Sequence, residues 1–65
     1  MKLKEWIEKE HKTQQEVADA IGVAQGQVSA WCSGDKMPRP GNIRNIVELT
    51  HGEVQPNDFY KNLEE

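Results

Sequence analysis

Apolar side chains recur every three or four residues along most of this chain, a spacing that predicts helices rather than strands. Helices are expected over about residues 2–11, 14–21, 24–32 and 40–50. A short fifth helix is expected to begin at Pro56, with Asn57 and Asp58 near its positive end. The pattern therefore predicts an all-α fold of four to five short helices, formed by residues 1–65 as a single domain.

Local signals mark where these helices begin and end. Thr13 and Glu16 have the capping-box spacing, in which each side chain accepts a hydrogen bond from the other residue's backbone N–H. Gly22 follows the second apolar stripe and is suited to the positive φ that often ends a helix. Pro40 suits the first turn of a helix, and His51 with Gly52 is expected to end that helix.

The C-terminal half also allows a second interpretation. Residues 46–50 and 53–55 could form a β-hairpin with a tight turn at His51 and Gly52, which would give a mixed α+β fold. The stripe at Ile43, Ile46 and Val47 favours the helix, because the adjacent apolar residues 46 and 47 break the alternation of a strand.

The helix over residues 24–32 carries the candidate functional surface. Val28 and Trp31 lie three residues apart and are expected to face the core. The side chains left outside are small or carry amides: Gln25, Gly26, Gln27, Ser29 and Ala30. A Gln amide can form a bidentate pair with the edge of adenine, Ser can contact several bases, and Ala can pack on a thymine methyl. No charged residue occurs from residue 23 to residue 34, which suits close approach to DNA base edges.

Residues 13–34 resemble the helix-turn-helix of phage Cro and repressor proteins and of YdaS-like antitoxin/regulators. The residues that carry the resemblance are Gln14, Ala18, Gly22, Val28 and Trp31. The resemblance implies a lambda-repressor-like, Cro-type domain with residues 24–30 in the DNA major groove. It also implies that Gln14 and Gln25 form the pair that touches phosphate and base. Gly26 departs from the family pattern and weakens the helix by about 1 kcal/mol relative to Ala.

The net charge of −3 argues against DNA binding, but the charges are unevenly distributed. Residues 51–65 carry the whole excess, whereas residues 1–50 hold seven basic and seven acidic groups. Lys36, Arg39 and Arg44 form a basic run directly after the candidate recognition helix. Lys and Arg supply affinity by neutralising phosphates. We therefore expect DNA phosphate contacts from these three residues and from Gln14.

The chain has material for one small core. Its expected members are Leu3, Ile7, Val17, Ala18, Ile21, Val23, Val28, Trp31, Ile43, Ile46, Val47, Leu49 and Phe59. One recognition helix reads few base pairs, and the resembling proteins bind as dimers. We expect a homodimer on double-stranded DNA with a palindromic operator. The candidate dimer residues are Phe59, Tyr60, Leu63 and Val54, with Trp6 assigned either to the core or to the interface.

Other functions find little support in the residues. Cys32 is alone, and His11 and His51 lie forty residues apart, so no metal or cofactor is expected. We predict no enzyme, since no catalytic set is evident, and a cytoplasmic protein of a bacterial or phage-infected cell, since no transmembrane run or signal peptide occurs. The leading hypothesis is a transcriptional repressor. The alternatives are an antitoxin-like regulator that also binds a toxin, and a protein-interaction module without DNA binding.

Overall fold

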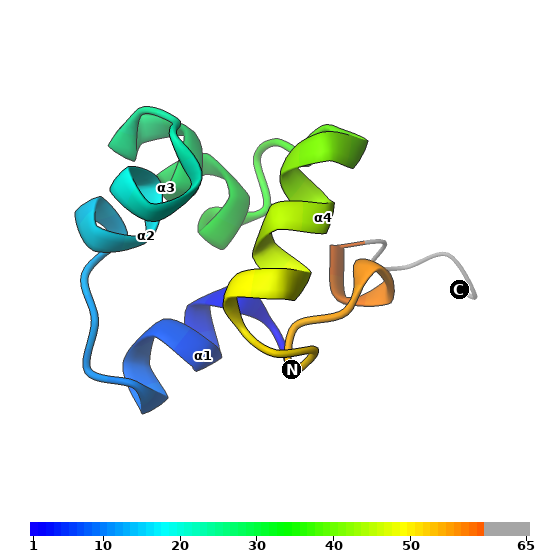
Figure 1. The fold of residues 1–65 in the computed structure, drawn as a ribbon. Helices are drawn as coiled ribbons and strands as arrows, with labels where there is room; N and C mark the ends of the chain where they lie inside the picture. Colours follow the sequence, from blue (N-terminus) through cyan, green and yellow to red (C-terminus); the bar gives the residue numbers. More distant parts are fainter. Residues whose placement is uncertain (60–65) are drawn as a thin grey trace.

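The computed structural model describes residues 1–59 and shows a bundle of short helices (Figure 1). In chain order the elements are α1 (Leu3–Lys9), α2 (Gln14–Ile21), α3 (Gln25–Ser33), α4 (Pro40–Leu49) and the 3-10 helix η1 (Pro56–Phe59). Helix α2 packs against α3 and α4, α1 lies against α3, and η1 lies against α4. The all-α prediction is confirmed, whereas the β-hairpin alternative is wrong, because residues 46–49 complete α4.

The predicted capping signals form as expected at the start of α2. Thr13 Oγ1 accepts from the Glu16 N–H at 3.1 Å, and a Glu16 carboxylate oxygen accepts from the Thr13 N–H at 2.8 Å. Pro40 occupies the first turn of α4, where its missing N–H removes no helical hydrogen bond. The helix boundaries lie within about two residues of those predicted, the usual scatter where helix ends fray.

All four α-helices end in the same kind of turn. The residue after each C-cap, or the C-cap itself, has a left-handed backbone conformation, and these residues are His11, Gly22, Gly34 and His51. The amide of the following residue then bonds back to a carbonyl of the last turn, as in Lys12 N–H to Ile7 O at 3.0 Å. Glycine adopts this conformation with least strain, and the two histidines adopt it at a steric cost. These turns let four helices reverse direction within a very short chain.

The core lies between α1, α2, α3 and α4. Its buried members are Leu3, Trp6, Ile7, Val17, Ala18, Val28, Trp31, Ile46 and Val54, with Ile21, Val23, Cys32, Leu49 and Phe59 packed at its edge. Trp6 therefore belongs to the core. Val54 is fully buried, so its expected role at a dimer interface is wrong. Val47, which we expected in the core, is only half-buried and lies outside this cluster.

Thr50 joins the end of α4 to the segment that follows. Its side chain is fully buried; Oγ1 accepts from the Val54 N–H at 3.1 Å and donates to the Val47 carbonyl at 3.3 Å. A buried backbone N–H without a partner would cost about 1–3 kcal/mol, so this hydroxyl lets the chain turn back through the core.

Three surface contacts hold the segment after α4 against the N-terminal part of the chain. The ammonium of Met1 donates to the Glu53 carbonyl at 2.7 Å and to Asp58 Oδ2 at 3.0 Å. Lys9 Nζ forms an ion pair with the Glu53 carboxylate. Within the described part of the chain, every helix is too short or too polar to cross a membrane.

Candidate nucleic-acid interface

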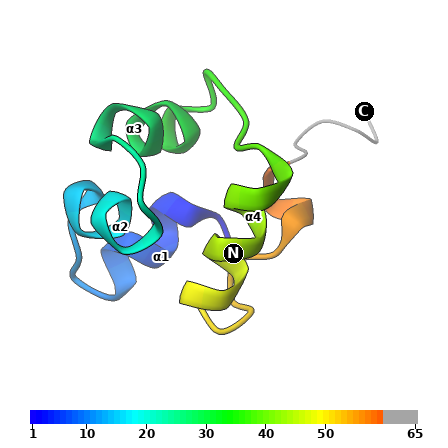
Figure 2. The ribbon, with the colours of Figure 1, turned by 45° about the horizontal axis from the view of Figure 1, so that its top comes forward.

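Helices α2 and α3 pack against each other and are joined by a tight turn at Gly22. The backbone of Gly22 is left-handed, with φ of 80°, and its N–H and that of Val23 both bond to the Ala18 carbonyl. Figure 2 shows the turn beside α2, and the connection to α4 beginning at the other end of α3. Val28 and Trp31 anchor α3 on the core, as predicted, and leave its first turn at the surface.

The side chains of Gln14 and Gln25 contact each other at the N-terminal ends of these two helices. Gln25 Nε2 donates to Gln14 Oε1 at 2.7 Å, which joins the first residue of α2 to the first residue of α3. Gln25 is exposed and Gln14 is half-buried. The contact leaves the Gln25 carbonyl oxygen and its second N–H free to pair with a base, while the Gln14 amide also hydrogen-bonds to the Cys32 thiol.

The side chain of Gln27 forms a hydrogen bond at the start of its own helix. Its Oε1 accepts from the Ala24 N–H at 3.3 Å, so the side chain caps the start of α3. The sequence signal for this contact is weak, because Ala24 lacks the hydroxyl of an ordinary capping box. Gln27 remains exposed and keeps its two amide hydrogens as donors. In this conformation its side chain is therefore suited to donate hydrogen bonds to acceptor atoms on a base edge.

Gly26 and the two residues further along α3 differ in exposure. Gly26 lies open at the surface, and a Cβ atom built there would meet no other atom within 4 Å. Ser29 and Ala30 are half-buried, so they are less accessible than the outward face we predicted. The exposed part of the predicted recognition surface is therefore its first turn, formed by Gln25, Gly26 and Gln27.

Two basic side chains lie beyond the C-terminal end of α3. Lys36 and Arg39 are exposed in the connection between α3 and α4, and neither forms an ion pair within residues 1–59. Arg39 is the N-cap residue of α4, and no side chain caps that helix end. Uncapped N–H groups and a guanidinium at one helix start favour an anion such as phosphate.

Arg44 lines a groove that contains none of the other candidate phosphate ligands. It lines a groove on α4 together with Pro40, Ile43, Val47, Glu48 and Pro56. Pro56 begins η1, so the groove is lined by α4 and η1, and neither α2 nor α3 contributes a residue to it. The short distance between Arg39 and Arg44 in the sequence does not bring Arg39 into this groove.

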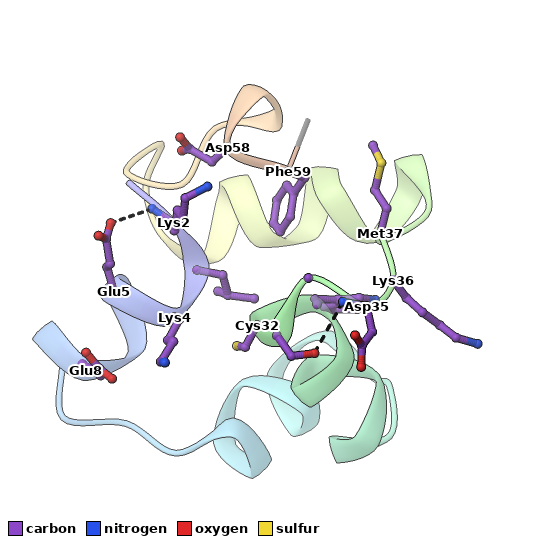
Figure 3. A pocket seen from close by; sticks show the side chains of 14 residues that line it. Lys2, Lys4, Glu5, Glu8, Cys32, Asp35, Lys36, Met37, Asp58 and Phe59 are labelled. Atoms are coloured by element: carbon purple, nitrogen blue, oxygen red, sulfur yellow. Dashed lines mark hydrogen bonds between the residues drawn. The ribbon is translucent and has the colours of Figure 1, made fainter. Parts of the chain in front are cut away.

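A separate pocket of about 620 Å³ lies between the start of α1, the end of α3 and Phe59 (Figure 3). None of the five predicted base-contact residues lines it, and Lys36, on its rim, extends away from it. Cys32 lines this pocket. Burial raises the pKa of its thiol, and Lys4 opposes that shift. The cation whose charge acts on Cys32 is therefore Lys4 of α1.

Comparison with known proteins agrees with this geometry. A family model described as helix-turn-helix matches residues 3–54, so the chain belongs to that family. The match is consistent with helix-turn-helix proteins of the Cro and repressor type, and the family consists of DNA-binding regulatory domains rather than enzymes. No curated protein and no solved structure gives a significant match to the chain.

Proposed function

We propose that this protein is a sequence-specific transcriptional repressor of the phage Cro type, with α3 in the major groove of its operator. The contact between Gln25 and Gln14 is the observation that carries the proposal. An amide fixed by a second amide presents its remaining donor and acceptor in one orientation, which is what bidentate recognition of adenine requires. A merely solvated helix face would not need this restraint.

The charge distribution supports the same orientation on DNA. The first turn of α3 carries no charge, while Lys36 and Arg39 follow at the far end of the helix. Uncharged amides would then meet the base edges, and the two cations with Gln14 would meet phosphates. With only two flanking cations, non-specific binding should be weak and should fall less steeply with salt than that of a strongly basic repressor.

A single first turn of α3 reads too few base pairs to define an operator. We therefore propose that the protein binds as a homodimer to a palindromic site, with half-sites about one helical turn apart. Repression would follow from occupation of a promoter in the cytoplasm of a bacterial or phage-infected cell.

Selection of bound duplexes from a randomised DNA pool at low to moderate salt tests this proposal. An inverted repeat with half-site centres about 10 base pairs apart would support both sequence reading and two-fold binding. The same selection with Gln25→Ala should lose the preference at one position of each half-site. Recovery of no sequence above background would overturn the proposal and favour a protein-interaction module.

A further inference from the structure

The α4 groove is the surface that the proposed DNA contacts leave unused. Its apolar lining comes from Pro40, Ile43, Val47 and Pro56, and its charged members are Arg44 and Glu48. Ile43 is buried, as expected, whereas Val47 lies outside the core cluster of the described residues, although it was expected there. Val47 is half-exposed, so a β-branched apolar side chain stands at the surface beside two prolines.

The charges in this groove are self-complementary. Arg44 and Glu48 lie four residues apart on α4, yet they form no ion pair with each other or with any other residue of the range 1–59. In an isologous pair, residue i of one copy meets residue j of the other, and j meets i. A two-fold axis through the groove would therefore set each Arg44 against the Glu48 of the second copy.

The position of the groove fits two copies on one DNA duplex. It begins at Pro40, directly after Arg39 of the proposed DNA surface, and it is lined by α4 and by Pro56 of η1, with no residue from α3. Because α3 contributes no residue to the groove, a second copy seated there leaves both α3 helices outside the contact, as two separate half-sites require.

We infer that the α4 groove is the homodimer interface, with Val47 at its centre and reciprocal pairs between Arg44 and Glu48. This inference moves Arg44 from the phosphate contacts to the dimer contacts. It deepens the proposed function, but it is measured on the protein without DNA. Its failure therefore leaves the reading of a half-site by α3 untouched.

Charge exchange tests the reciprocal pairs by sedimentation velocity. Arg44→Glu and Glu48→Arg should each weaken self-association about tenfold or more, because every pair becomes a like-charge contact. Mixing the two variants should restore association, since position 44 of each chain then faces the opposite charge at position 48 of the other chain. Lys12→Glu and Glu8→Arg make the same kind of charge change at exposed positions outside the groove and serve as controls. Unchanged association of both variants, or no recovery on mixing, would overturn the pairing.

Amide NMR spectra of the wild-type chain from micromolar to millimolar concentration locate the face. Concentration-dependent shifts should concentrate on residues 40–48 and on the neighbours of Pro56, and Val47→Asp should abolish them while the dispersed spectrum shows that the fold is kept. Shifts elsewhere, or none over this range, would overturn the inference. Contacts between the Val47 methyls and residues 60–65 in concentration-independent spectra would also overturn it, because the chain would then fill its own groove.

Discussion

Gln14 and Gln25 begin successive helices, and their amides lie 2.7 Å apart from nitrogen to oxygen. The contact makes α2 a support for the residue that we assign to base reading. A side chain held in place before binding loses less conformational entropy when it pairs with a base than a free one does.

Replacing Gln25 by Ala should therefore reduce both affinity and selectivity. We expect Gln25→Ala to weaken binding to the selected operator by about 1–3 kcal/mol and to relax the preference at one base pair. Gln14→Ala should have a smaller effect in the same direction, and the double variant should lose less than the two single losses together. Gln15→Ala is the control, since the Gln15 amide bonds to Asp19 on α2. Equal losses for Gln25→Ala on every sequence would remove Gln25 from the base contacts.

Gly26 offers a second test of how closely α3 approaches DNA. Nothing in the protein lies within 4 Å of a Cβ placed there, and its φ is not positive, so the fold does not require glycine. Gly26→Ala should stabilise the free protein by about 0.5–1 kcal/mol in thermal unfolding. It should nevertheless weaken operator binding, because the added methyl enters the space between helix and base pairs. A more stable variant with unchanged affinity would place Gly26 away from the DNA.

Replacing Arg39 and replacing Arg44 should have different effects on the salt dependence of DNA binding. On a duplex with one half-site, Arg39→Ala should lower the slope of log K against log salt by about one unit for one lost phosphate contact. Arg44→Ala should leave that slope unchanged, since Arg44 lies in the α4 groove. Lowered slopes for both variants would return Arg44 to the phosphate contacts, and an unchanged slope for Arg39→Ala would exclude Arg39.

Local signals predicted the helices well, whereas contacts between distant segments were harder to foresee. The capping box at Thr13 and the stop at Gly22 depend on neighbouring residues, so spacing alone located them. The burial of Val54 depends on a turn after α4 that the sequence did not define, and the short run from Arg39 to Arg44 did not indicate that Arg44 alone of these two lines a groove. Family resemblance named Gln14 and Gln25 as a pair of DNA contacts, but it did not predict that their amides contact each other, since no periodicity indicates which side chains meet across a turn.

The Thr50 hydroxyl should be essential for the segment after α4. Thr50→Val keeps the shape of the side chain but leaves the buried Val54 N–H without an acceptor, so unfolding should become easier by about 1–3 kcal/mol. For a domain of this size, each kcal/mol lowers the melting temperature by about 4–8 °C. Thr50→Ser keeps the hydroxyl and should recover part of the loss. If Thr50→Val has the same melting temperature as the wild type, the hydrogen bond contributes no net stability.

Asp58 should make the stability of the segment after α4 depend on pH in the acidic range. Burial alone would raise the pKa of the Asp58 carboxyl, but hydrogen bonds from the Gln55 N–H at 2.8 Å and from the Met1 ammonium hold it below its ordinary value of 3.8. A carboxylate with a lowered pKa in the folded state stabilises the protein above its unfolded pKa, and this stabilisation is lost as the pH falls through the folded value. Asp58→Asn should therefore be less stable by about 1 kcal/mol at neutral pH, and the difference from wild type should shrink below pH 3.8. Urea unfolding across this pH range measures the difference, with Asp19→Asn as the control on an exposed helix position. A constant difference at every pH would show that the Asp58 charge does not contribute.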